Sequence, residues 1–292
     1  MATRNTTITK LAIELAGKLA ATVSSLQLPG YRVEQVVVPT GPNASARLGV
    51  NVDITPLDAA FTLTQSDALT DWALSLPRGK GAQPLNGAAL VLDINSKLTR
   101  RVEWTEALVT ELRLPELDAA SKTAFILGLT WLPSTVTYAK VSGEIIALPP
   151  ASKTKKTPML ANFRVLGLPF DGKFVSRVTL PTVTGTLAAQ KPGYAQVDSG
   201  DVTLVLSARS RDEALVWVQQ VVADGQIADK EYLSLDIELL DAALKNVLLT
   251  VQLSGCALLG YEESRLDPAQ EALGTVTLRF AVGKLDVVFA GV

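Results

Sequence analysis

Apolar and polar residues alternate along several stretches of the chain. Residues 233–239 read LSLDIEL, residues 247–253 read VLLTVQL and residues 90–94 read LVLDI, so every second position is Leu, Ile or Val. A period of two is typical of a β-strand that buries one face. The pattern therefore predicts a mainly β chain built from antiparallel strands.

Two stretches have a helical period instead. Apolar residues at the spacing i, i+3, i+4, i+7 predict one short amphipathic helix in each half of the chain: Leu69, Trp72, Ala73 and Leu76 in the first, and Ala214, Trp217, Val218, Val221 and Val222 in the second. Asp67, and either Ser210 or Asp212, precede these stripes and are candidates to cap the helices, because their side-chain oxygens can accept the free N–H groups of a first turn.

Short sequence frames recur in the same order in both halves. The pairs are VVVPT at 36–40 with VTLPT at 178–182, DALTDW at 67–72 with DEALVW at 212–217, LVLDI at 90–94 with LSLDI at 233–237, and LDAA at 117–120 with LDPA at 266–269. An alternating strand follows the last frame in each half: Leu127, Leu129 and Trp131, then Val276, Leu278 and Phe280. The shift between partners stays between 142 and 149 residues. This regularity predicts a tandem duplication, with each unit a small β-sandwich or barrel that has an α-helix capping one end.

The ends of the two units are suggested by composition. Residues 149–158 read PPASKTKKTP, which has three prolines and no apolar period, and predict a linker. Residues 7–26 place Ile8, Leu11, Ala12, Leu15 and Leu19 on one helical face and predict an added amphipathic helix without a counterpart in the second half. The expected organisation is an N-terminal helical arm at 1–27, a first tube-like β domain at 28–148, the linker, and a second tube-like β domain at 159–292. We expect the arm to pack on another chain.

Composition narrows the chemistry. The chain has 292 residues, 48% of them hydrophobic, with no histidine and one cysteine, Cys256. These counts exclude a Ser-His-Asp triad, a histidine metal site and a thiolate zinc site. The net charge of −2, with neither half strongly basic, does not favour nucleic-acid binding. The chain lacks an apolar run of membrane-spanning length. The lysines and glutamate within residues 8–26 argue against a signal peptide, and the lone cysteine suggests synthesis in a reducing cytoplasm.

The first unit resembles the tail tube proteins of contractile-tailed phages and phage-related contractile injection systems. The resemblance rests on LTQSDALTDWALSL at 63–76, AALVLDINSKLTRRVEWTEALVTELRLPELDAAS at 88–121 and ILGLTWLPSTV at 126–136. It covers residues 60–138 well and residues 200–289 more loosely. It implies a structural protein that assembles with copies of itself into a closed ring, six units to the circle.

Three departures from that family qualify the resemblance. The chain has two units in place of one, residues 7–26 replace a glycine-rich beginning, and the basic-to-aromatic segment from Arg101 to Trp104 becomes an apolar strand around Val247–Leu253 in the second unit. These departures favour a specialised terminal, adaptor or initiator ring, or a tandem-unit tube subunit.

Several segments imitate catalytic motifs. SKTK at 152–155 matches a Ser-Lys dyad, but Lys155 lies among other lysines in the expected linker, where it should be solvated and charged. RGKG at 78–81 is glycine-rich, yet it follows the first helix, where a turn is expected, and Arg78 and Lys80 are candidates to contact an acidic neighbour.

Carboxylates, tryptophans and the cysteine are also candidates for function. Asp118 and Asp267 fall in matching turns, and Asp93 and Asp236 in matching strands, as repeated scaffold residues would. Trp72, Trp104, Trp131 and Trp217 could stack sugars or bases, but most lie on predicted core stripes. Cys256 is expected to be a small buried hydrophobe. We therefore expect no catalytic, cofactor-binding or metal-binding residues.

The sequence thus predicts a non-enzymatic ring component of a contractile phage tail or injection system. Its expected partners are copies of itself, as a trimer with pseudo-sixfold symmetry or otherwise as a hexamer with one unit in each of two layers. Neighbouring tube, sheath, baseplate or cap proteins are further expected partners, with no sequence-specific nucleic acid and no membrane insertion. The alternative is a tandem β-sandwich module of a virion that binds a receptor or carbohydrate.

Overall fold

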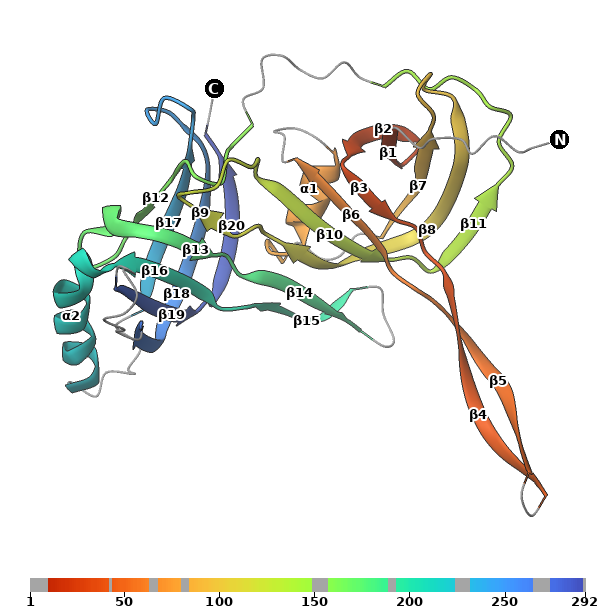
Figure 1. Ribbon diagram of the computed structural model, residues 1–292. Coiled ribbons are helices and arrows are strands. Elements are labelled where there is room, and N and C mark those ends of the chain that lie inside the picture. The colour runs from red at the N-terminus through yellow and green to blue at the C-terminus, as the bar shows by residue number, and fades with distance from the viewer. Residues whose placement is uncertain are drawn as a thin grey trace, which may run out of the picture.

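The computed structural model describes residues 10–41, 44–62, 68–79, 84–148, 157–188, 193–223, 232–264 and 274–290 (Figure 1). The first half, residues 10–148, contains β1 (Lys10–Leu15), β2 (Lys18–Val23), β3 (Ser25–Gln27), β4 (Tyr31–Gly41), β5 (Ala44–Ile54), β6 (Leu57–Thr62), α1 (Ala68–Ser75), β7 (Leu85–Leu92), β8 (Leu98–Arg113), β9 (Leu117–Asp118), β10 (Ile126–Leu132) and β11 (Thr135–Ala139).

The second half, residues 157–290, contains β12 (Phe163–Leu166), the 3-10 turn η1 (Gly172–Phe174), β13 (Val175–Thr179), β14 (Thr182–Leu187), β15 (Tyr194–Ser199) and β16 (Val202–Ser207). After these come the 3-10 turn η2 (Ala208–Ser210), α2 (Arg211–Ala223), β17 (Leu233–Leu240), β18 (Val247–Glu263), β19 (Thr275–Ala281) and β20 (Lys284–Phe289). The predicted mainly β fold with an α-helix in each half is confirmed.

Both halves pair their strands in the same order. In the first half β8 pairs with β7, β10 and β11, while β10 also pairs with β6. In the second half β18 pairs with β17, β19 and β20, while β19 also pairs with β16. The strands β1 and β3 lie against β7 and β6 as β12 and β13 lie against β17 and β16. We call two strands counterparts when they occupy the same place in this order.

Hairpins and helices occupy matching places as well. The hairpin β4–β5 connects β3 to β6, and the hairpin β14–β15 connects β13 to β16. The helix α1 follows β6, and α2 follows β16. Among the described strands, β2 and β9 lack a counterpart. In this order Trp72 and Trp217 lie on the helices α1 and α2, which occupy matching places.

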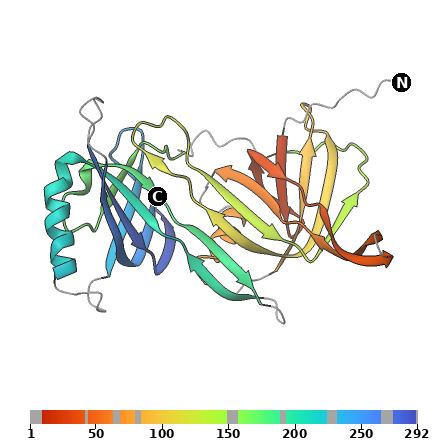
Figure 2. The ribbon, with the colours of Figure 1, turned by 60° about the horizontal axis from the view of Figure 1, so that its bottom comes forward.

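The helix α1 is the more deeply buried of the two. Leu69, Trp72, Ala73 and Leu76, the predicted stripe, are all buried in the core of the first half. In α2 only Ala214 and Val218 are buried, and Val222 is exposed. The helix α2 thus buries a narrower stripe than α1, and it lies at the outer end of the molecule in both views (Figure 1, Figure 2).

The predicted helix at residues 7–26 is wrong over the described part, residues 10–27. These residues form β1, β2 and β3. The strand β1 pairs with β7, and Ala12 and Ile13 are both 0% exposed. The segment is therefore part of the first half's core, and its strand β1 has a counterpart in β12.

The error has a physical cause. The strand β1 is covered on both faces, since Ile13 packs in the main core and Ala12 in a second cluster with Leu90, Leu92 and Leu98. A strand buried on both faces is apolar at consecutive positions and is indistinguishable from a helix by period alone. The turn decides the matter: Ala16 and Gly17 have φ values of 49° and 75°, the left-handed pair that a two-residue hairpin turn requires.

The aspartate frame at the end of β7 also needs correction. Leu92 pairs with Leu98 across a turn, and Leu240 pairs with Val247 across the matching turn. The counterpart of Asp93 is therefore Asp241, and Asp236 lies five residues too early. Both aspartates fold their turns alike: Asp93 Oδ1 accepts from the backbone N–H of Lys97 at 2.9 Å, and Asp241 Oδ1 accepts from that of Lys245 at 3.1 Å.

The frames VVVPT at 36–40 and VTLPT at 178–182 do not occupy matching strands. Residues 36–40 lie within β4, whereas residues 178–182 span the end of β13 and the start of β14. Of the predicted helix caps, Asp67 lies outside the described residues. Ser210 Oγ is buried and has no hydrogen-bond partner among the residues that the structure describes. The linker prediction at 149–158 falls mostly outside the described residues as well, and the domain limits stay a prediction.

Candidate functional site

The most distinctive surface of the chain is the junction where the two halves exchange strands. The strand β9, from the first half, pairs with β13 and so joins the sheet of the second half. The strand β14, from the second half, pairs with the end of β8 and so joins a sheet of the first half. Figure 1 and Figure 2 both show the hairpin β14–β15 reaching from one half across to the other.

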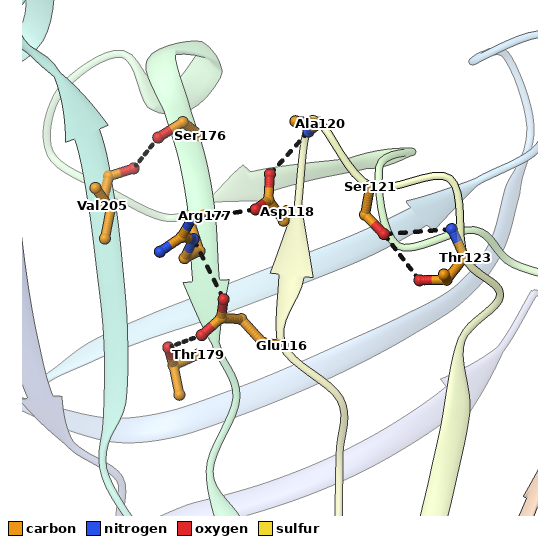
Figure 3. Close-up of polar contacts among 9 residues, drawn as sticks. All are labelled: Glu116, Asp118, Ala120, Ser121, Thr123, Ser176, Arg177, Thr179 and Val205. Carbon is orange, nitrogen blue, oxygen red and sulfur yellow. Dashed lines mark hydrogen bonds and ion pairs between the residues drawn. The ribbon is translucent and has the colours of Figure 1, made fainter. Parts of the chain in front are cut away.

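At one edge of the junction, Arg177 of β13 lies between two carboxylates (Figure 3). Its Nε is 3.2 Å from Glu116 Oε1 and its Nη2 donates to Asp118 Oδ2 at 3.2 Å. Thr179 Oγ1 donates to the other Glu116 oxygen at 3.0 Å. Because half of the Arg177 side chain is exposed, solvent screens these pairs, and each adds little to stability. Their main effect is to fix the register between β9 and β13.

Asp118 contributes to this edge in a second way. Its Oδ1 accepts from the backbone N–H of Ala120 at 2.8 Å, which closes the turn after β9. This hydrogen bond, together with the Arg177 guanidinium, lowers the pKa of the Asp118 carboxyl below its ordinary value. The turn continues with the Ser121 and Thr123 hydroxyls bonded to each other, and Ser176 Oγ donates to the carbonyl of Val205 (Figure 3).

A second part of the junction is the backbone ladder between β14 and β8. Thr182, Val183 and Thr184 of β14 lie opposite Arg113, Leu112 and Glu111 of β8 in an antiparallel ladder. Val183 and Leu112 are both 0% exposed, so this pair continues the hydrophobic core through the junction. Apolar burial is the principal stabilising contribution here.

Glycine permits a close approach between the halves. A Cβ atom placed on Gly185 of β14 would lie 2.7 Å from Leu76 Cδ1 and 2.7 Å from the Tyr194 ring. Leu76, which follows α1, therefore packs directly on the backbone of the second half. Burial also raises the pKa of Tyr194 to about 12.

Arg78 forms another side-chain bridge between the two halves. Its Nε donates to Asp286 Oδ1 at 3.0 Å, and its Nη2 donates to the carbonyl of Val287 at 2.9 Å. Arg78, a candidate to contact an acidic neighbour, thus meets an acidic residue of its own chain. Lys80 lies outside the described residues. Gly79, with φ of 60°, ends the helical segment in a turn as predicted.

Beside the junction, Arg113 organises polar groups on β8. Arg113 is paired with Asp58 of β6 and lies 3.1 Å from Glu111 Oε1. Its Nη1 donates to Thr130 Oγ1 at 2.7 Å. The network holds β6, β8 and β10 in fixed register where β14 arrives.

The structure separates the other predicted candidates. Of the two turn aspartates, Asp118 lies at the junction and Asp267 lies outside the described residues, as does Lys155. Asp93 folds its own turn, and Asp236 lies on β17, so neither belongs to the junction. No site in the described part of the chain brings these carboxylates together.

The tryptophans and the cysteine are core residues. Trp72, Trp104 and Trp131 are buried. Trp131 contacts the other two, with centroids 5.8 Å apart for Trp72–Trp131 and 5.5 Å for Trp104–Trp131. Trp217 is partly buried against Phe280. Cys256 is buried, and burial raises the pKa of its thiol to about 11. The three buried rings are not available to stack a sugar or a base.

Across the described ranges, no group of three or more His, Cys, Asp or Glu residues is placed to hold a metal ion. Within the same ranges, no helix has both the length and the apolar character to cross a bilayer.

Sequence reasoning missed most of the junction. The sequence does not indicate the roles of Arg177, Gly185 and Leu112, because residues of these types are common in ordinary strands. A signal was present in Gly185, a glycine inside an alternating strand, which often marks a close backbone approach.

Comparisons with known proteins gave matches only among solved structures. No family model matches the chain, and no curated protein sequence matches it. A chain from the six-fold symmetrised anti-feeding prophage baseplate is 17% identical and covers 49% of this chain and 99% of its own length, with a TM-score of 0.43. A chain from the sheath/tube terminator of an extracellular contractile injection system is 12% identical and covers 48% and 100%, with a TM-score of 0.40. Hcp1 from Flavobacterium johnsoniae is 14% identical and covers 47% and 97%, with a TM-score of 0.30.

Proposed function

We propose that the chain is a ring-forming structural component of a contractile phage tail or phage-related injection system. One observation carries the proposal: two halves with the same strand order are joined by strands that complete each other's sheets. Units joined in this way can be repeated around a circle until every strand edge has a partner. The sequence resemblance to tail tube proteins supplies the kind of particle.

The two halves are proposed to be tandem copies of one ancestral unit, with residues 149–158 as the linker between them. The matching turns at Asp93 and Asp241 support this, since they share the same pattern of hydrogen bonds at corresponding strand ends. The departures of the second half, including a polar and more exposed α2, fit units that face different neighbours.

The proposed ring contains three chains and therefore six units, with pseudo-sixfold symmetry. The strands β8 and β14 meet in the hydrogen-bonding direction, which sets the halves side by side within one sheet. A side-by-side relation favours three chains in one layer over six chains in two layers. Such a ring fits the end of a tube, or an adaptor or initiator position, where it would contact tube, sheath, baseplate or cap proteins.

The proposed role is mechanical and assigns no catalytic residue, cofactor or metal to the chain. It also places the protein in the cytoplasm during synthesis and in an assembled particle afterwards. Exposed stacking residues would favour the receptor- or carbohydrate-binding alternative, and the three buried tryptophans do not provide them.

Mass measurement of the purified protein tests the proposal. The chain has a mass of 31.0 kDa, so native mass spectrometry over a range of concentrations resolves one, three and six copies clearly. We expect three copies, and an annular particle by negative-stain electron microscopy. Six copies with the units in two layers would contradict the trimer but keep the ring. A chain that stays monomeric at all concentrations, without rings, would contradict the proposed function.

A further inference from the structure

The junction inside the chain indicates which strands meet between chains. Its central element is the short ladder in which Val183 of β14 lies opposite Leu112 of β8. On the other side of β8, Leu112 lies opposite Leu129 of β10. The end of β8 is thus a central strand, paired on both sides.

The corresponding end of β18 has one side unpaired among the described strands. Tyr261 of β18 lies opposite Leu278 of β19, as Leu112 lies opposite Leu129, so Tyr261 is the counterpart of Leu112. Within the described residues, no strand pairs with the other side of residues 257–263. An open edge presents unpaired N–H and C=O groups to solvent and is a template for an added strand.

In the first half, the hairpin β14–β15 pairs with the end of β8. The counterpart of this hairpin is β4–β5. Tyr31 lies opposite Ile54 at its base, as Val183 lies opposite Ser199. Directly before these pairs, the backbone N–H of Thr55 donates to the carbonyl of Gly30 at 2.9 Å. In the same way, the backbone N–H of Gly200 donates to the carbonyl of Thr182 at 2.9 Å. By this register Gly30, Tyr31 and Arg32 correspond to Thr182, Val183 and Thr184.

The hairpin β4–β5 projects from the molecule and is exposed. In Figure 1 it extends beyond the first half, at the opposite end of the chain from β18. Among the described strands, β4 and β5 pair only with each other. Their apolar side chains lie in solvent: Tyr31 is 56% exposed, Val37 58% and Val52 60%. An exposed apolar strand pair of this kind requires a partner in the assembled state.

We propose that β4 of one copy of this chain adds to the open edge of β18 of the next copy. Gly30, Tyr31 and Arg32 would then lie opposite Glu262, Tyr261 and Gly260 of that second copy in an antiparallel ladder. The inference rests on the proposed ring and specifies its interface between chains.

The side chains suit this register. Tyr31 comes opposite Tyr261, and directly opposed aromatic residues stabilise antiparallel strands. Arg32 lies on the opposite face of the ladder from Tyr31 and diagonally from Glu262, within reach of its long side chain, so the pair brings opposite charges together. A β4 strand cannot make these contacts with β18 of its own chain, because the two lie at opposite ends of the molecule (Figure 1).

Engineered disulfides test the register directly. Residues directly opposite in an antiparallel ladder have Cα atoms about 4.5–5.5 Å apart, within the range that a disulfide spans. We would introduce Arg32→Cys together with Gly260→Cys and oxidise the protein under native conditions. A Cβ on Gly260 meets nothing within 4 Å, so the substitution fits the isolated chain. The native Cys256 is buried and its pKa is raised to about 11, which keeps it from competing near neutral pH.

Two further variants are matched controls. Thr184→Cys with Glu111→Cys occupies the equivalent pair inside one chain and should form an intrachain disulfide without changing the mass. Arg32→Cys with Gln252→Cys keeps the first cysteine but moves the second along β18, and it should form no disulfide between chains. These controls separate register from mere proximity of two reactive thiols.

Denaturing gels without reductant give the readout, with native mass measured on the same samples. We expect the Arg32/Gly260 pair to give a ladder that ends at the number of chains in the ring, with at least tenfold more cross-linking than the Arg32/Gln252 pair. Rings without this cross-link would overturn the inference and leave the proposed function standing. Equal cross-linking by the two pairs would also overturn it. A monomeric chain without cross-links would contradict both.

Discussion

Trp72 of α1 meets Trp131 of β10 edge-on, with ring centroids 5.8 Å apart and planes inclined by 63°. The counterpart contact joins Trp217 of α2 to Phe280 of β19, with centroids 6.2 Å apart. In each half, therefore, the tryptophan of the helix packs against an aromatic residue of an equivalent strand, β10 in the first half and β19 in the second. The contact fixes how each helix sits on its sheet.

The first prediction follows from this equivalence. Trp131→Ala should lower the free energy of unfolding by about 3–5 kcal/mol, the range for deleting a buried aromatic side chain. Trp131→Phe should cost roughly half of that or less, because Phe280 shows that a phenyl ring suits the position. The indole Nε1 that it removes is buried without a partner among the described residues. Urea unfolding of both variants checks this, and equal costs would contradict it.

The second prediction compares the two equivalent turns. Asp241 is 3% exposed and its carboxylate accepts from the backbone of Lys245 and from Asn246 Nδ2 at 2.8 Å. Asp241→Ala removes a buried carboxylate and its charge-assisted hydrogen bonds, and it should cost about 1.5–3 kcal/mol. Asp93→Ala removes similar bonds from an exposed turn, where water replaces them, and should cost about 1 kcal/mol or less. Chemical denaturation measures both, and a larger cost for Asp93→Ala would refute the role given to burial.

Strong periods made much of this fold predictable. The stripes of α1 and α2 and the alternation of β17 and β18 follow from residue types that bury one face, and the structure contains all four elements. Residues 10–27 misled because β1 is buried on both faces, so the sequence loses its period of two there. The frame at 90–94 misled for a related reason: Leu-x-Leu repeats along an alternating strand, so a match can slide by several residues without losing its apolar pattern.

The junction was beyond sequence reasoning. Residues 111–113 and 182–184 pair although about 70 residues separate them, and nothing in single strands of ordinary composition specifies so distant a partner. The sequence predicts Asp118 as a turn residue, and the structure adds its ion pair with Arg177. Arg78 was only a candidate for an acidic contact, and the structure pairs it with Asp286 of the other half.

The third prediction concerns the close approach at Gly185. Gly185→Ala should destabilise the chain by about 1–3 kcal/mol through overpacking against Leu76 and Tyr194. Leu76→Ala removes the side chain with which the added methyl group clashes. The loss of stability in the double variant should therefore be smaller than the sum of the losses in the two single variants. Gly260→Ala, where the added methyl meets nothing within 4 Å, is the matched control and should change stability by about 0.5 kcal/mol or less. Additive costs would argue against a direct Leu76–Gly185 contact.

The fourth prediction is a pH dependence. The pKa of Asp118 is lowered in the folded chain from its ordinary value of 3.8. A lowered carboxyl pKa stabilises the folded state above the unfolded value, and this stabilisation disappears as the pH falls through the folded value. Asp118→Ala should therefore reduce the urea midpoint near neutral pH, and the difference from the wild type should shrink once the pH falls below 3.8.

The Arg177→Ala background is the control for this titration. Removing the guanidinium takes away the charge partner of Asp118 but keeps the hydrogen bond from Ala120. The effect of Asp118→Ala should therefore become smaller, though not zero, in that background. An undiminished effect of Asp118→Ala at low pH would mean that ionisation of this carboxylate has no part in the junction.

The fifth prediction separates folding from assembly. Replacing residues 31–54 by Asn-Gly joins Gly30 to Thr55, which are already hydrogen-bonded to each other, through a two-residue turn of the kind favoured in hairpins. The hairpin removed is exposed, so the free energy of unfolding should change by no more than about 1 kcal/mol. Assembly into rings should be lost, because the strand proposed to add to β18 of the next copy is gone.

Shortening the counterpart hairpin gives the opposite expectation. The matched variant replaces residues 183–199 by Asn-Gly, which joins Thr182 to Gly200. This change removes Val183, which is 0% exposed, and uncovers Leu112 on β8. Because this hairpin is already seated on its partner within the chain, its loss should destabilise the folded monomer by several kcal/mol, on the order of two buried side chains and a lost ladder. Thermal unfolding together with native mass decides between the two outcomes. If both shortened chains assemble normally, neither hairpin is an assembly strand; if both unfold alike, β4–β5 contributes to the monomer core and its exposure has been misjudged.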